Sequence, residues 1–209
     1  MNVYLLKNQM RPILISIVAM LTVISCQSDE EKQQQAIMKE CTVVGDKIAM
    51  ASFESLSGNL KAAASNGGIT NAIQFCNMNA LPLTDSLSKT FNAKIKRSSL
   101  KLRNPGNQPD SLEAYMLDLY LQIQKMKKPM VGKTLLANNG DVRYFAPIML
   151  KSQCLKCHGV IGQDIKDETY AIIKEHYPID QAVGFQEGEL RGIWSINFGN
   201  IEELEKSTE

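Results

Sequence analysis

The first half of the chain has the hydrophobic spacing of two helices. From residue 34 to 64 apolar positions recur every three or four residues, which predicts a long amphipathic helix. The Asn-Gly-Gly sequence at 66–68 predicts its end, because glycine readily adopts the backbone conformation that terminates helices. Thr70 is a good capping residue for a second helix, which carries Cys76 on its apolar face and which Pro82 is expected to restart.

The middle of the chain predicts a strand, a helix and a hairpin. Residues 93–103 alternate between polar and apolar side chains, as in a half-buried strand. Asp110 and Glu113 form a capping-box pattern that opens a helix over 111–128. Two β-like runs flank the Asn-Asn-Gly sequence at 138–140, which predicts a hairpin turn. The apolar stripe expected on the helix consists of Leu112, Tyr115, Met116, Leu119, Ile123 and Met126.

The order of these elements predicts an α+β fold. A short helix is expected at 168–176 and a closing strand at 191–198. Helices first, then a hairpin and a last strand, predict an antiparallel sheet covered by helices on one side. One domain is expected over residues 36–200, with a long N-terminal helix and a C-terminal tail at 201–209.

The N-terminus has the organisation of a bacterial lipoprotein signal peptide. Lys7 and Arg11 precede an apolar run at 13–24 that is shorter than a typical membrane-spanning helix. The run ends in Val-Ile-Ser-Cys, which resembles a lipobox and predicts lipidation at Cys26. An uncleaved anchor helix is the alternative. Either version predicts an exported protein tethered to the periplasmic face of a membrane or to the cell surface.

Composition and charge narrow the class of protein. Removal of the predicted signal peptide, residues 1–25, leaves 184 of the 209 residues, with 21 basic and 22 acidic side chains. This length suffices for one domain with its own core. A nearly neutral chain without a basic cluster gives no reason to expect nucleic-acid binding. Residues 26–35 are acidic and polar, which predicts a flexible tether.

The candidate chemistry lies in one five-residue window. Cys154, Cys157 and His158 take two of the five cysteines and one of the two histidines. Their order is the C-x-x-C-H pattern of c-type haem attachment, in which two thiols bond to the vinyl groups and the histidine ligates iron. From the chain's own frequencies of Cys and His, roughly 0.001 accidental matches are expected.

Two other readings of the cysteine pair find less support. A zinc site would need two more ligands, and Cys41, Cys76 and His176 form no second close pair. A thioredoxin-type dithiol would belong to a βαβ pattern, and no such pattern surrounds Cys154.

Four stretches of the chain resemble the PAS-like c-type haem-binding domains of bacteria, a family catalogued as a domain of unknown function. The stretches, in the family's order, are 72–76, 95–113, 144–159 and 177–198. The resemblance implies a PAS-like antiparallel sheet flanked by helices, one covalent haem c, and a six-coordinate iron with His158 on one side. It places the second axial ligand at Cys76, whose thiolate would give a low reduction potential. Phe185 departs from the family, in which tyrosine is common.

Alternatives to these assignments remain open at this stage. Cys76 on an apolar helix face is also typical of a small buried residue, and Cys41 lies on an equally apolar face. A Cys41–Cys76 disulfide would remove the ligand in an exported protein. His176 or a methionine is another candidate ligand. Candidate partners of the haem propionates are Arg97, Arg103 and Arg191.

These predictions favour single-electron transfer by a membrane-tethered monohaem cytochrome, because two protein ligands leave no open iron position. The alternative is a redox or gas sensor that signals to a separate protein. A haem peroxidase is not expected, since no spare histidine has a suitable setting for acid–base work. The expected partner is a redox protein or a signalling protein, and the long N-terminal helix allows a homodimer.

Overall fold

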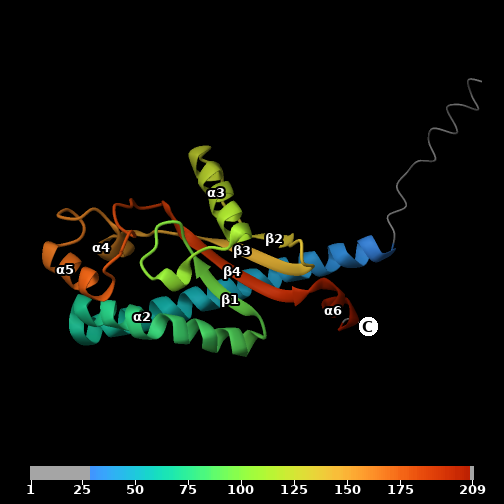
Figure 1. Cartoon of the computed structure of the whole chain (residues 1–209), viewed down its shortest axis with the longest axis horizontal. Coiled ribbons are helices and arrows are strands. Elements are labelled where there is room, and N and C mark those ends of the chain that lie inside the picture. Colours follow the sequence, from blue (N-terminus) through green and yellow to red (C-terminus); the bar gives the residue numbers. More distant parts are fainter. Residues whose placement is uncertain (1–28, 208–209) are drawn as a thin grey trace, which may run out of the picture. The chain divides into compact units, whose positions relative to one another are not determined.

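The computed structural model describes residues 29–207 (Figure 1). The chain divides into two units, residues 1–34 and 35–209, and the packing described below belongs to the second. Within residues 29–207, none of the helices combines the length and hydropathy of a membrane span. The elements are α2 (Asp29–Phe91), β1 (Lys94–Ser98), η1 (Pro105–Asn107), α3 (Ser111–Lys125), β2 (Lys133–Leu136), β3 (Asp141–Met149), η2 (Ser152–Cys154), α4 (Leu155–His158), α5 (Asp167–His176), β4 (Leu190–Asn200) and α6 (Ile201–Lys206).

Helix α2 consists of two arms joined at Gly67 and Gly68, where the sequence predicted a break. Gly68 has a φ of 70°, a conformation that residues with a Cβ rarely adopt. Figure 1 shows the two arms lying antiparallel along the sheet. The second arm continues through Pro82 to residue 91, so the proline does not restart the helix as predicted.

The N-terminus of α2 corrects the prediction of a flexible tether. Residues 29–35, the described part of that segment, are helical. Three acidic residues in the first turn, Asp29, Glu30 and Glu31, explain the early start, because negative charge is favourable at a helix N-terminus. The predicted C-terminal tail likewise contains helix α6, whose Ile201 is buried.

The sheet is antiparallel throughout and has the order β1-β4-β3-β2. The final strand therefore lies between β1 and β3, which closes the sheet through contacts between distant parts of the chain. Strands β2 and β3 form the predicted hairpin. Its turn is closed by a 2.9 Å hydrogen bond from Gly140 N to Ala137 O, and Gly140 has a φ of 82°.

Helices cover both faces of the sheet, whereas the sequence predicted cover on one side. On one face Tyr144 and Trp194 pack with Ile48 of α2, and on the other Phe145 packs with Met116 of α3. The reason lies in β3 and β4, which carry apolar side chains on both faces. An antiparallel strand of this kind has to be buried on both sides.

Helix α3 has the predicted capping box, with Glu113 N donating to Asp110 Oδ1 at 2.8 Å and Asp110 N donating to Glu113 Oε2 at 3.0 Å. Its buried face differs from the predicted stripe. Tyr115 and Met126 are exposed, and the buried residues are Glu113, Met116, Leu117 and Tyr120. Glu113 is buried because its carboxylate accepts hydrogen bonds from Lys96, Ser98 and Arg143.

Strand β1 ends at Ser98, five residues before the predicted end. Ser99 N donates to Asn107 O at 3.3 Å, which turns the chain away from β4. Leu100, predicted to be on the buried face, is consequently 48% exposed. This early turn places residues 99–103 at the end of the sheet where α4 lies.

Candidate functional site

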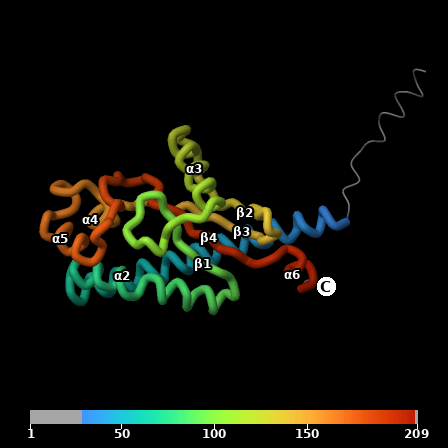
Figure 2. Tube along the Cα trace, in the orientation of Figure 1, coloured from blue at the N-terminus to red at the C-terminus, as the bar shows by residue number. Residues whose placement is uncertain are grey.

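Helix α4 brings the three residues of the C-x-x-C-H pattern together. Strand β3 ends at Met149, and a 3₁₀ turn leads directly into α4, so that Cys154, Cys157 and His158 share one helical turn. Gly159 ends the helix. A residue with a Cβ would not fit at this position without a shift, because that Cβ would lie 2.5 Å from the Cβ of Asp164. Figure 2 shows α4 and α5 gathered at one end of the sheet, beside the turn of α2.

The ring of His158 is held in one orientation by a backbone carbonyl. Its Nδ1 lies 2.8 Å from the oxygen of Ala182. Because a carbonyl only accepts hydrogen bonds, Nδ1 carries the hydrogen and Nε2 keeps its lone pair. Burial, with the charges of Arg191 and Arg103, lowers the pKa of His158 well below its usual value. The result is a neutral imidazole whose Nε2 is available to a metal.

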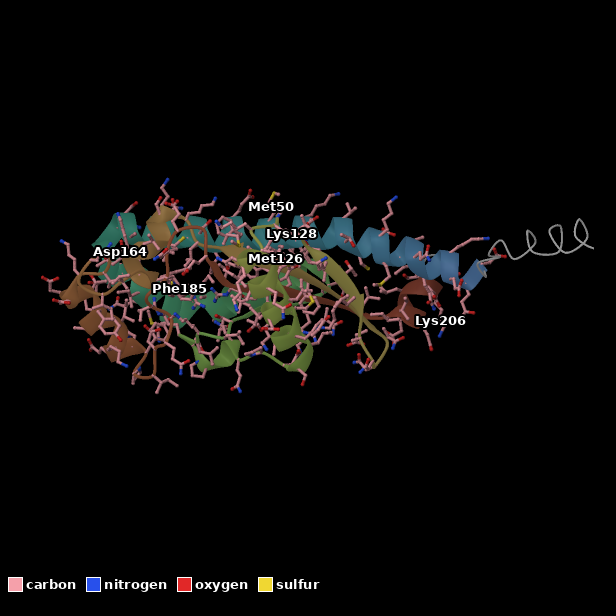
Figure 3. The ribbon with its side chains drawn as sticks, turned by 90° about the horizontal axis from the view of Figure 1, so that it is seen from above. Met50, Met126, Lys128, Asp164, Phe185 and Lys206 are labelled. Carbon is pink, nitrogen blue, oxygen red and sulfur yellow. The ribbon has the colours of Figure 1, made fainter. Side chains whose placement is uncertain are left out.

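Phe185 contacts the edge of the His158 ring. The ring centroids are 6.4 Å apart and the planes are inclined at 89°. Figure 3 labels Phe185 at the end of the structure where α4 and α5 lie. Next to this contact the backbones of residues 184–185 and 158–159 are hydrogen-bonded to each other. Phe185 N donates to His158 O at 3.0 Å, and Gly184 N donates to Gly159 O at 2.7 Å. The segment after α4 is therefore tied to the loop that orients the histidine.

In the described part of the chain, two of the three predicted arginines lack an acidic partner. Within residues 29–207, neither Arg97 nor Arg191 forms an ion pair with a carboxylate, and the Nε of each is buried without a hydrogen-bond partner. Arg97 stacks over Trp194 at 5.9 Å from the ring centroid. Arg191 Nη1 donates to Ser99 Oγ at 2.6 Å. Burial, followed by repulsion from Arg103 and Arg97, lowers the pKa of Arg191 to about 10.

Arg103 differs from the other two because it has a protein carboxylate. Its Nε and Nη2 donate to the two oxygens of Asp180, each at 3.0 Å, and the Asp180 side chain is fully buried. Arg103 Nη2 also donates to the carbonyl oxygen of Cys157 at 2.6 Å. By sequence, the three arginines have the same predicted role. In the structure, within residues 29–207, Arg103 has a carboxylate partner, whereas Arg97 and Arg191 have none.

Arg97 and Arg191 are half-buried, with buried Nε atoms, and a cation removed from water is unfavourable without a counterion. The two arginines therefore fit an anionic group that residues 29–207 do not supply. The two carboxylates of a haem match this requirement in number and charge. The donor set also matches haem, since two thiols and one free imidazole nitrogen lie on one helical turn.

Cys76 comes to the site from the second arm of α2. Ile73, one turn earlier, belongs to an apolar cluster with Tyr177 and with Cys157 itself. Burial raises the pKa of Cys76, and the charges of Arg97 and Arg103 act in the opposite direction. Cys76 in turn contributes to the raised pKa of Cys157. The turn of α2 that carries Ile73 and Cys76 therefore packs near Cys157, although Cys76 and Cys157 are 81 positions apart in the sequence.

Known proteins with related sequences or structures identify the family. A sequence model of the Tll0287-like family matches residues 7–198. The chain belongs to the Tll0287-like family. A structure described as the crystal structure of the cyanobacterial heme-protein Tll0287 shares the fold, with a TM-score of 0.53 and 23% sequence identity. The match covers 73% of this chain and 92% of that one. Curated proteins show no match.

Membership in the Tll0287-like family confirms the family that the four sequence stretches predicted, and the α+β fold is confirmed as well. Other expectations fall outside this comparison. The predicted signal peptide at 1–25 and the lipidation site Cys26 lie outside the described residues.

The structure contradicts the alternative in which Cys41 and Cys76 form a disulfide. Both residues are free thiols. Cys41 packs with Val142 and Ile201. Cys76 instead interacts electrostatically with Arg97, Arg103 and Cys157. Burial, followed by the charge of Glu40, raises the pKa of Cys41 to about 11. Cys41 is thus a core residue in a different cluster, and the sulfur of Cys76 remains available.

The remaining alternatives gain no support from the described part of the chain. Residues 29–207 contain no cluster of three or more His, Cys, Asp or Glu side chains placed to hold a bare metal ion, as a zinc site would need. The sheet has no parallel βαβ unit of the thioredoxin type. His176 ends α5, and its carbonyl, rather than its ring, accepts a hydrogen bond from Asn77 Nδ2.

Sequence reasoning missed two groups in the site. Asp180 is the buried partner of Arg103, and the carbonyl of Ala182 orients His158. Asp180 lies in an irregular loop, where no periodicity distinguishes a buried acid from an exposed one. A backbone carbonyl carries no sequence signal at all.

Proposed function

We propose that this protein binds one haem c through thioether bonds at Cys154 and Cys157. The observation that carries the proposal is the single helical turn that holds both thiols and a correctly oriented His158. Each thiol adds across one vinyl double bond, so that sulfur bonds to one carbon and the thiol hydrogen goes to the other. The solved heme-protein of the Tll0287-like family supports this assignment.

His158 Nε2 and Cys76 Sγ are the two protein groups that would hold the iron. Two observations support this pairing: the free lone pair of Nε2, and the packing of Cys157 in the cluster of Ile73, one helical turn before Cys76. Burial raises the pKa of the Cys76 thiol, and the positive charges of Arg97 and Arg103 oppose this rise. The thiolate is the form of cysteine that binds metals. A thiolate ligand favours a low reduction potential.

Arg97 and Arg191 are proposed to receive the haem carboxylates. We expect Arg97→Met to lower the unfolding free energy of the haem-containing protein by about 3 kcal/mol, because it leaves a buried anion without its partner. Denaturation by guanidinium, followed by the haem absorption band, measures this change. If Arg97 faced no anion, removal of an unpaired buried charge would stabilise the protein instead. Lys156→Met, at an exposed position beside Cys157, is the matched control.

Single-electron transfer is the function that we infer from this site. Bound haem supplies a one-electron couple that no side chain of this chain provides. If His158 and Cys76 both held the iron, no position would be left for a substrate, and the protein would pass single electrons from a reduced partner protein to an oxidised one. Lipidation at Cys26 would hold the protein beside its redox partners, at the periplasmic face of a membrane or at the cell surface.

A redox or gas sensor is the second candidate, and the position of Cys76 favours it. The residue lies in the arm of α2 that follows the Gly67–Gly68 break, so that loss of the sulfur ligand would free this arm to move. Such movement would carry the signal to a separate protein.

Carbon monoxide distinguishes the two functions. We expect the reduced protein to show no change in its absorption spectrum over minutes at saturating carbon monoxide, because both axial positions are occupied. Stopped-flow and static spectra of the reduced protein measure this. Complete binding within the mixing time would show a readily displaced ligand and would support the sensor in place of electron transfer.

A further inference from the structure

Three segments of the chain meet at the carbonyl oxygen of Ala182: its own loop, the end of helix α4 and the loop that carries Arg103. This oxygen accepts a hydrogen bond from His158 Nδ1 at 2.8 Å and a second one from Arg103 Nη2 at 3.2 Å. The backbone reinforces the junction, because Gln181 N donates to Leu102 O at 2.7 Å. The guanidinium of Arg103 and the imidazole of His158 therefore compete for the electron density of one acceptor.

Asp180 completes the arrangement from the same loop. Its carboxylate binds Arg103 through two hydrogen bonds, and its Oδ1 also accepts one from Ala182 N at 3.0 Å. Asp180 is fully buried and the Arg103 side chain is only 11% exposed. Solvent therefore screens these two charges weakly. Arg103 and Asp180 each form a hydrogen bond with the backbone of Ala182, whose carbonyl oxygen accepts from His158.

We propose that Arg103 and Asp180 are positioning residues that set the reduction potential of the site through Ala182 and His158. The proposal rests on the haem-binding function proposed above. Arg103 draws electron density from the Ala182 carbonyl and thereby weakens its hydrogen bond to His158. A weaker bond leaves the imidazole less electron-rich, which disfavours the oxidised iron. The positive charge of Arg103 acts in the same direction, and the negative charge of Asp180 opposes both effects.

The two residues should shift the potential in opposite directions when each is neutralised. Arg103→Gln leaves Asp180 as an unbalanced anion and is expected to lower the reduction equilibrium constant about tenfold, a downward shift of about 60 mV at 59 mV per tenfold for one electron. Asp180→Asn leaves Arg103 unbalanced and is expected to raise the constant by a similar factor. If the two residues only held His158 in its orientation, both substitutions would weaken that support and would shift the reduction potential in the same direction.

Potentiometric titration of the haem-containing proteins tests this inference, and the pyridine haemochrome of each variant reports covalent attachment separately. Lys101→Gln is the matched control, since Lys101 is an exposed cation of the same loop whose Nζ donates to Val183 O but reaches neither Asp180 nor Ala182. The reduction equilibrium constant of Lys101→Gln is expected to change by less than twofold. A lowered reduction equilibrium constant in Arg103→Gln together with a raised one in Asp180→Asn supports the proposal. Changes of the same sign in the two variants, or changes below twofold in both, overturn it.

If Arg103→Gln cannot be matured with haem, Asp180→Asn and Arg103→Lys decide the matter. A raised reduction equilibrium constant in Asp180→Asn, together with a smaller change of that constant in Arg103→Lys, which keeps the positive charge, supports the proposal. An unchanged or lowered constant in Asp180→Asn overturns it. Absence of covalent haem from the unmodified protein would instead refute the proposed function, which keeps the two failures distinct.

Discussion

The double variant Cys154→Ala/Cys157→Ala, matured in a host that assembles cytochromes c, should contain no covalently attached haem. Without these thiols no sulfur remains on the α4 turn to add to the vinyl groups, although His158 keeps its ligating nitrogen. Intact-protein mass spectrometry should show the polypeptide mass alone. Any haem that copurifies should be removed by acidic acetone, which leaves thioether-linked haem on the chain.

Single variants refine this result. Cys154→Ala and Cys157→Ala should each retain haem through one thioether, with a pyridine haemochrome band displaced toward that of haem with one free vinyl group. Cys41→Ala is the matched control, because Cys41 is a buried thiol in a different cluster. It should keep the full complement of covalent haem. Covalent haem in the double variant would show that another residue carries the attachment, and the proposed site would then be wrong.

Replacement of Cys76 by alanine should have the second largest effect. We expect the low-spin thiolate signal in the electron paramagnetic resonance spectrum of the oxidised protein to disappear, because the anionic sulfur ligand is lost. The reduction potential should rise by on the order of 0.1 V or more, since axial ligands set haem potentials over a range of about 0.8 V. The reduced variant should also bind carbon monoxide rapidly at the vacated position.

Cys76→Met separates ligation from packing. A thioether ligand raises the potential but keeps the iron six-coordinate, so this variant should bind carbon monoxide slowly, unlike Cys76→Ala. An electron paramagnetic resonance spectrum that is the same in Cys76→Ala and in the unmodified protein would exclude Cys76 as the ligand. His176 or a methionine would then be the candidate to test next.

Much of the fold was predictable because its signals are local. The break at Gly67–Gly68, the turn at Gly140 and the capping box of Asp110 each depend on residues within a few positions of one another. The same is true of the C-x-x-C-H turn, whose thiols and histidine are brought together by a single helical turn. For such features the backbone conformation of a short segment decides the outcome, and the residue types in that segment reveal it.

The sequence was least informative where side chains from distant segments meet. Hydrophobic periodicity predicts that a helix has a buried face, but it did not show that Glu113 belongs to that face, because Lys96 and Arg143 neutralise it from other elements. It also did not show that the sheet is covered on both sides, since this depends on how β3 and β4 pair.

The sequence by itself determined the residues that attach haem in the proposed site and the order of the helices and strands. The tertiary structure alone decided how the other groups around them are paired. It paired Asp180 with Arg103 and kept Cys41 apart from Cys76. Among residues 29–207, it left Arg97 and Arg191 without a carboxylate partner. The physical reason is that ion pairing and burial act between atoms a few ångströms apart, and the two partners can be 77 positions apart in the chain, as Arg103 and Asp180 are.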